Sequence, residues 1–132
     1  MKTGEKAILK KAFSEQEVRL FAELSGDDNP VHLDLAYAEN TQFGQRIVHG
    51  MLVSSLITGV IGGILPGHGC IYLGQTLSFK APVYLDEPIE ASVEVIHMRE
   101  DKPIVTLKTI CQKADGTIAI EGEAVVKIAR VS

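Results

Sequence analysis

Residues 48–65 read VHGMLVSSLITGVIGGIL and contain no Asp, Glu, Lys or Arg. The length of this run alone reaches the threshold for a membrane span. However, glycine, serine and threonine dilute its apolar character, and neither end carries the basic or aromatic residues that anchor a span at the membrane surface. A helix that is apolar on all sides and lies outside a membrane is surrounded by protein. The run therefore predicts a long central helix that the rest of the chain encloses.

A strand pattern follows the predicted helix almost to the end of the chain. Apolar and polar residues alternate in four stretches, at 71–80, 89–95, 104–112 and 117–129. The Asp115-Gly116 pair before the last stretch is typical of a hairpin. Residues 7–13 are expected to add an edge strand. Because 132 residues fit one domain, we expect a single α+β domain over residues 1–132, in which an antiparallel sheet wraps around the long central helix.

A shorter helix is predicted near the N-terminus by Ser14-x-x-Glu17, which has the form of a capping box. Gly26 is well placed to end this helix. Its apolar face is expected to consist of Val18, Phe21 and Leu24. Asp34 is expected to cap a further short helical turn.

The composition excludes several classes of function. The net charge is −4, and the charged residues are spread along the chain, so no basic surface for nucleic acid is expected. Cys70 and Cys111 are too few for a disulfide framework or a cysteine zinc site, and each is expected to be a small buried residue. No apolar run of signal-peptide length follows the N-terminal residues. We therefore expect a cytoplasmic protein without a membrane anchor.

The histidines are scattered along the chain, and their spacing matches no zinc site, so no metal is expected. They are His32, His49, His68 and His97. His68 lies in a Gly/Pro turn and is expected to be exposed, whereas His97 continues the apolar face of the 89–95 stretch and is expected to be half-buried.

The loop after the first helix holds the first candidate for chemistry. Asp27 and His32 lie five residues apart across a turn that Pro30 stiffens. Such a pair can hold a water molecule and exchange protons with it, which is general acid–base catalysis. Asn29 between them can hold a partner in place through hydrogen bonds. The same residues are also what an ordinary turn with a surface histidine contains, so spacing alone leaves both interpretations open.

The start of the central helix is the second candidate. Helix N-termini present unpaired N–H groups and partial positive charge, and a glycine such as Gly50 lets a carbonyl oxygen approach the backbone closely. This is the arrangement of an oxyanion hole. The alternative is an ordinary helix start at which His49 serves as a capping or packing residue.

These residues resemble a known family. The segment Phe21-Ala-Glu-Leu-Ser-Gly-Asp27-Asp-Asn29-Pro30-Val-His32, with Ala38 six residues further on, is similar to the hydratase-2 motif of the MaoC-like hot-dog proteins. The chain as a whole resembles the short, single-domain (R)-specific enoyl-CoA hydratases of bacteria. Further similar segments are Ile47–Leu52, Ile71–Lys80, Arg99–Ile104 and Gly122–Lys127.

The resemblance implies a hot-dog fold and a function. It implies that Asp27 and His32 are the catalytic residues, that Asn29 orients them, and that the backbone N–H of Gly50 polarises the thioester carbonyl. The substrate would be a trans-2-enoyl-CoA, hydrated to the (R)-3-hydroxyacyl-CoA without a cofactor. The chain would form a homodimer or a larger oligomer.

The substrate pocket implied in this way includes His49, Met51 and Thr58. Thr58 departs from the family, whose close members tend to carry serine there. Two other hot-dog activities remain as alternatives, an acyl-CoA thioesterase and an acyl-carrier-protein 3-hydroxyacyl dehydratase. A third is a noncatalytic subunit that binds acyl thioesters.

Overall fold

The computed structural model describes residues 1–129, and its elements follow the predicted order. They are β1 (Lys6–Lys11), α1 (Glu15–Ser25), α2 (Pro30–Leu33), α3 (Leu35–Glu39), α4 (Gly50–Gly63), β2 (Ile71–Gln75), β3 (Ser78–Phe79), β4 (Ile89–Met98), β5 (Ile104–Lys113) and β6 (Ile118–Lys127). Among these residues, no helix is long and apolar enough to cross a membrane.

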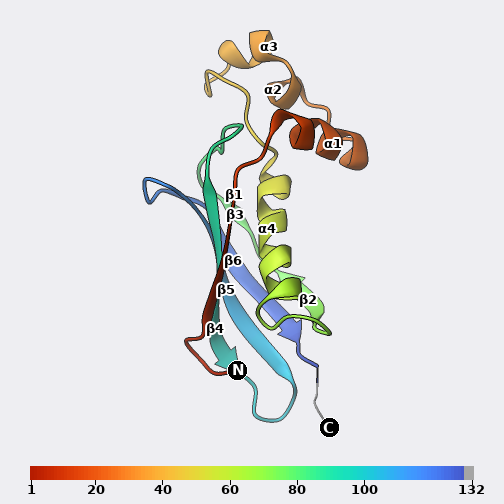
Figure 1. Cartoon of the computed structure of the whole chain (residues 1–132), viewed down its shortest axis with the longest axis vertical. Coiled ribbons are helices and arrows are strands. Elements are labelled where there is room, and N and C mark those ends of the chain that lie inside the picture. Colours follow the sequence, from red (N-terminus) through yellow and green to blue (C-terminus); the bar gives the residue numbers. More distant parts are fainter. Residues whose placement is uncertain (130–132) are drawn as a thin grey trace.

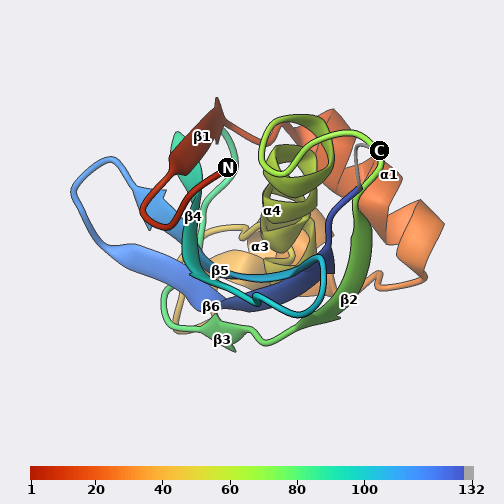
Figure 2. The same ribbon diagram turned by 90° about the horizontal axis from the view of Figure 1, so that it is seen from below.

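The strands form one antiparallel sheet in the order β1-β4-β5-β6-β2, and β3 also pairs with β6. The sheet curves around α4, with β1 and β4 on one side of the helix and β2 on the other (Figure 2). The three short helices α1, α2 and α3 gather beyond the N-terminal end of α4 (Figure 1). This arrangement confirms the predicted α+β class, the central helix and the position of β1 at an edge of the sheet.

The core lies between α4 and the concave face of the sheet. The apolar positions of β4 alternate with polar ones and are buried, as predicted. They are Ile89, Ala91, Val93 and Val95. Helix α4 turns one face toward them, formed by Val53, Ser54, Leu56, Ile57, Val60 and Ile61. Burial of this apolar surface is the main stabilising contribution to the fold.

The opposite face of α4 is not covered, so the prediction of a fully enclosed helix is wrong for the single chain. Met51 and Ile64 are more than half exposed, and Thr58 is exposed as well. The sheet of one chain ends at β1 on one edge and at β2 on the other, so the side of α4 between these two edges stays uncovered (Figure 2). The apolar residues on the uncovered side remain available to a partner.

The stretch 71–80 does not form the one long strand that its alternation predicts. It is divided into β2 and β3 at Thr76, whose N–H donates to the carbonyl of Glu123 at 2.9 Å. The residues expected on its buried face are mostly exposed, with relative exposures of 55% for Ile71, 53% for Leu73 and 55% for Phe79. The alternation predicts strand correctly, but the core of this chain does not cover the apolar face.

Helix α1 begins and ends as predicted. The Ser14 side chain accepts from the Glu17 N–H, Glu17 completes the capping box, and Gly26 follows in the left-handed conformation with φ 81°. Val18 is buried, but Leu24 is 77% exposed and Ala22 takes the buried position instead. Steps of three residues fall behind the helical repeat of 3.6, so the third position has rotated away from the core.

Two further expectations concern isolated side chains. His68 is exposed as predicted, whereas His97 is exposed and not half-buried. A register shift between Val95 and His97 interrupts the alternation of β4 and turns His97 outward. Cys111 is buried, and its burial raises the pKa of the thiol to about 12. Cys70 is partly buried.

Candidate active site

The loop between α1 and α2 brings the predicted acid–base residues together. Gly26 ends α1, and the Asn29 side chain then caps α2 by accepting from the Val31 N–H. The Asp27 carboxylate accepts from the Asn29 N–H at 3.3 Å. Pro30 occupies the first turn of α2, where its missing N–H costs nothing. Asn29 thus links Asp27 to the short helix that carries His32.

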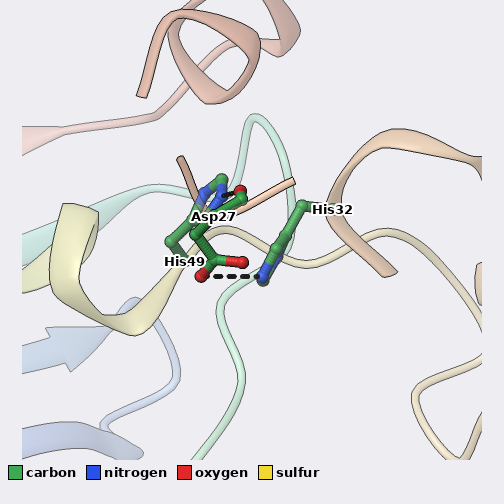
Figure 3. A group of neighbouring side chains, drawn as sticks. All are labelled: Asp27, His32 and His49. Carbon is green, nitrogen blue, oxygen red and sulfur yellow. Dashed lines mark hydrogen bonds and ion pairs between the residues drawn. The ribbon is translucent and has the colours of Figure 1, made fainter. Parts of the chain in front are cut away.

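His32 faces Asp27 across a gap of 3.9 Å between Nε2 and a carboxylate oxygen (Figure 3). The His32 side chain is 9% exposed, while that of Asp27 is 52% exposed. His32 Nδ1 lies 2.8 Å from the carbonyl of Ile47. A carbonyl only accepts, so Nδ1 carries the proton, and in the neutral ring Nε2 is left as a base. Two basic groups therefore face each other at a distance too long for a direct hydrogen bond.

His49 completes the cluster and is itself buried, with 2% relative exposure. Its Nε2 lies 2.9 Å from the backbone carbonyl of Asp27. Its ring stacks on that of His32, with centroids 3.8 Å apart and planes 24° apart. Burial lowers the pKa of His49, and the neighbouring His32 lowers it further. Its other nitrogen, Nδ1, has no hydrogen-bond partner among the described residues.

Arg46 connects the cluster to α1, although no motif in the sequence points to it. Its Nε donates to the His32 carbonyl at 2.8 Å, and its Nη1 donates to the Glu15 carboxylate at 3.0 Å. Hydrogen bonds from Arg46 and from Arg19 lower the pKa of Glu15. Since Arg46 and Glu15 are 31 positions apart, no local pattern in the sequence indicates this contact.

Gly50 is the first residue of α4 and lies beside the cluster. Its predecessor His49 occupies the N-cap position but makes no side-chain capping bond. The helix start is therefore not closed by a side chain. A methyl group on Gly50 would come within 2.7 Å of two ring carbons of Phe79. The glycine thus allows both the aromatic ring and an incoming group to approach the backbone.

Three hollows lie around this cluster, and the two larger ones each share lining residues with the smallest. One of about 230 Å³ is lined by Asp27, His32, His49, Gly50, Met51 and Phe79. A second, of about 400 Å³, shares Met51 with it and contains Thr58, Tyr72, Gln75 and Leu77 in its walls. A third, of about 340 Å³, shares Gly50 and Phe79 and is otherwise mainly apolar. The predicted pocket residues Met51 and Thr58 thus line the same hollow, while the buried His49 lines the smaller hollow with Asp27 and His32.

The cluster consists of residue types that also bind metal ions in proteins. The scattered positions of the histidines in the sequence did not predict that two of them lie together. Asp27, His32 and His49 each offer a ligand atom, and these atoms lie within 4.8 Å of one another. The lone pair of an imidazole nitrogen lies in the ring plane, and the planes of the two rings are almost parallel. Stacked rings direct these lone pairs side by side. Two rings stacked at 3.8 Å are therefore poorly placed to share one ion at the 2.0–2.1 Å that zinc requires.

Comparison with known proteins gives consistent matches. The family model described as "MaoC like domain" matches residues 2–115. The (R)-specific enoyl-CoA hydratase of Aeromonas caviae is 53% identical over 128 residues, which cover 97% of this chain and 96% of that protein. A 3-hydroxybutyryl-CoA dehydratase of Methylorubrum extorquens is 41% identical, with coverage of 97% and 81%.

The solved structures agree with these matches. The structure of the (R)-hydratase from A. caviae superimposes with a TM-score of 0.96 at 53% identity, and the match covers 98% of both chains. The antiparallel sheet around a helix is therefore the hot-dog fold that the sequence resemblance implied.

Proposed function

The chain belongs to the MaoC-like family, and we propose that it is an (R)-specific enoyl-CoA hydratase. It adds water reversibly to a trans-2-enoyl-CoA and gives the (R)-3-hydroxyacyl-CoA. The activity is that of a hydro-lyase, so dehydration is the reverse reaction of the same site. The observation that supports this proposal most directly is the pair Asp27 and His32, which face each other across 3.9 Å in a hollow.

The gap between the two residues suits a bridging water molecule. Water donates one hydrogen to His32 Nε2 and the other to the Asp27 carboxylate, and both groups accept. Its oxygen lone pair is then free to attack C3 of the enoyl group. One of the two residues takes a proton from this water, and a proton is delivered to C2. The new C3–O and C2–H bonds replace the C2–C3 π bond and one O–H bond of the water molecule, and no redox step occurs.

The negative charge that develops during this addition falls on the thioester oxygen. The backbone N–H of Gly50, at the positive end of the α4 dipole, is the proposed donor to that oxygen. Polarisation of the carbonyl makes C3 electrophilic without a metal ion. We assign no cofactor to the reaction, because side chains and backbone groups of the chain supply every proton transfer and the oxyanion donor.

In the proposed complex the acyl chain occupies the hollow beside Thr58. Met51 belongs both to this hollow and to the one that holds the catalytic pair. A substrate whose C3 lies between Asp27 and His32 can therefore extend past Met51 into a space of about 400 Å³. The exposed Thr58 contributes a hydroxyl to its wall.

A second copy of the chain is the proposed partner. Strand β2 ends the sheet and carries Ile71 and Leu73, both more than half exposed, beside the uncovered face of α4 with Met51. Exposed sheet edges and apolar patches of this kind mark association surfaces. A homodimer, alone or within a larger oligomer, would cover them. Two unpaired cysteines suit a reducing compartment, which supports a cytoplasmic location.

The function is tested by following the enoyl absorbance of crotonyl-CoA with the purified protein. Loss of absorbance, formation of the (R)-3-hydroxy product in a coupled assay with a stereospecific dehydrogenase, and no release of thiol are expected. Release of free thiol would identify a thioesterase instead. Turnover of crotonyl-acyl-carrier-protein with none of crotonyl-CoA would identify the carrier-protein dehydratase, and binding without any turnover would identify a noncatalytic subunit.

A further inference from the structure

We propose that His49 is a positioning residue that holds Asp27 and His32 at their working separation, an inference that rests on the proposed hydratase function. The two catalytic side chains are supplied by a loop and by a helix of only four residues, Pro30–Leu33. A loop and a single helical turn offer few contacts of their own to fix the two side chains relative to each other. His49 contacts both of them from the start of a long helix.

The first contact fixes Asp27. His49 Nε2 donates to the Asp27 carbonyl at 2.9 Å, although the two residues are 22 positions apart. The other hydrogen bonds of Asp27 involve Ser25 and Asn29, two positions away on either side. Those bonds shape the loop, but they do not attach it to another part of the molecule. The bond from His49 attaches it to the beginning of α4, where Gly50 also lies.

The second contact fixes His32. The His49 ring lies flat on the His32 ring, with centroids 3.8 Å apart. The edge of Phe21 meets His49 from another direction, with centroids 4.9 Å apart and planes 66° apart. His32 therefore cannot tilt toward His49 without losing this packing. Since Nδ1 of His32 is held by the Ile47 carbonyl, Nε2 keeps its direction toward Asp27.

The protonation state of His49 follows from its partner. A carbonyl only accepts, so Nε2 carries the proton and Nδ1 is a bare lone pair in the neutral ring. Burial favours this neutral form by lowering the pKa of His49. A neutral ring adds no positive charge beside His32, which remains free to take a proton from water.

Folding alone does not explain a histidine at this position. The side chain does not cap α4, although it occupies the N-cap position. Its Nδ1 is buried without a partner among the described residues, which is unfavourable for stability. A phenyl ring would fill nearly the same space without a buried nitrogen. The Nε2 donor is the property of histidine that this site uses.

Two substitutions separate the ring from the donor. His49→Phe keeps an aromatic ring and removes the Nε2 donor, whereas His49→Gln removes the ring and places an amide nitrogen near the position of Nε2. The exposed His97 provides the matched controls His97→Phe and His97→Gln. For all proteins, kcat and KM for crotonyl-CoA are measured together with the melting temperature and the far-UV circular dichroism spectrum.

For His49→Phe we expect a fall of kcat by about 100-fold, with KM within about three-fold of wild type, since displacement of catalytic groups by about 1 Å has effects of this size. His49→Gln should recover kcat to within about ten-fold of wild type, because it restores the donor. Neither variant should lose its folded spectrum, and the His97 variants should match wild type.

The inference is overturned if His49→Phe keeps wild-type kcat, or if a folded His49→Gln is as slow as His49→Phe. Loss of folded protein in proportion to lost activity in both variants would also overturn it, because the role would then be purely structural. The wild-type protein distinguishes these results from failure of the proposed function, since inactive wild-type protein would reject the hydratase assignment itself.

Discussion

The ring of Phe79 lies against the α-carbon of Gly50, so that a methyl group added there would meet two ring carbons at 2.7 Å. Phe79 comes from β3 and Gly50 begins α4, and the two residues form a common wall of two hollows beside Asp27 and His32. The amount of space at the proposed oxyanion donor therefore depends on the contact between them.

Gly50→Ala should reduce kcat/KM for crotonyl-CoA by about ten-fold or more, because the methyl group displaces the Phe79 ring and narrows access to the backbone N–H. The half-exposed ring can turn away, so the melting temperature should change little. Gly62→Ala is the matched control, since that glycine lies in the same helix with open space around it. Wild-type kcat/KM in Gly50→Ala would reject the proposed role of this backbone position.

Asp27→Asn and His32→Asn should each lower kcat by about 10²- to 10⁴-fold, the usual contribution of general acid–base catalysis. Asparagine at 32 offers an amide nitrogen near the position of Nδ1 for the Ile47 carbonyl but has no counterpart of Nε2. The neighbouring exposed Asp28 supplies the control Asp28→Asn, which should retain activity. Steady-state hydration of crotonyl-CoA is the measurement, and full activity in Asp27→Asn or in His32→Asn would disprove the proposed water-bridging pair.

Gly122→Ala should destabilise the folded protein by about 3 kcal/mol, as overpacking of a tight site does. A methyl group at Gly122 in β6 would overlap the backbone carbonyl of Thr76. That carbonyl belongs to the connection between β2 and β3, so it cannot move without disturbing the sheet edge. Urea unfolding followed by circular dichroism measures the change. An unchanged midpoint would show that this connection is easily displaced.

Leu73→Asp should shift the sedimentation coefficient toward that of the monomer and lower the hydratase activity, because it places a charge on the proposed association surface. Leu73 is 53% exposed on the edge strand β2. Leu24→Asp on α1, where the leucine is 77% exposed, should leave the assembly unchanged. If both variants sediment like wild type, β2 is not part of the interface.

The stability of the protein should depend on pH partly through His49. Burial lowers its pKa from the ordinary 6.5, so as pH falls through that value the ring binds a proton in the unfolded chain before it does in the native one. The unfolded state then holds more protons than the native state. The free energy of unfolding therefore decreases as the pH is lowered across this window. The fall in urea midpoint from about pH 7.5 to about pH 5.5 should therefore be smaller in His49→Phe than in wild type. Equal falls would contradict the buried neutral ring.

The sequence predicted the parts of the fold that depend on local patterns. The capping box at Ser14, the break at Gly26 and the alternation along β4 all follow from residues within a few positions of one another. The errors come from contacts that no local pattern records. The apolar Leu73 is not covered by the core of its own chain. The register shift that exposes His97 depends on how β4 pairs with β5.

The site was predictable to the same extent. The spacing of Asp27 and His32 alone is compatible with an ordinary turn and with a catalytic pair. The resemblance to a family favours the catalytic pair. The stacking of His49 on His32 and the hydrogen bond from Arg46 to the His32 carbonyl depend on the tertiary fold. The sequence therefore indicated His49 only as a pocket residue and did not predict its contacts with Asp27 and His32.

The residues proposed for proton transfer and the residues beside Thr58 come from two separate segments of the chain, which is useful for engineering. The proposed chemistry is carried by residues 27–50, one continuous segment, whereas Tyr72, Gln75 and Leu77 in the neighbouring hollow come from the segment around β2. A library of variants restricted to these three positions would alter the size and polarity of the space beside Thr58 and leave the proton-transfer groups untouched. If the hollow receives the acyl chain as proposed, such a library should change the selection among acyl chains without changing the addition of water.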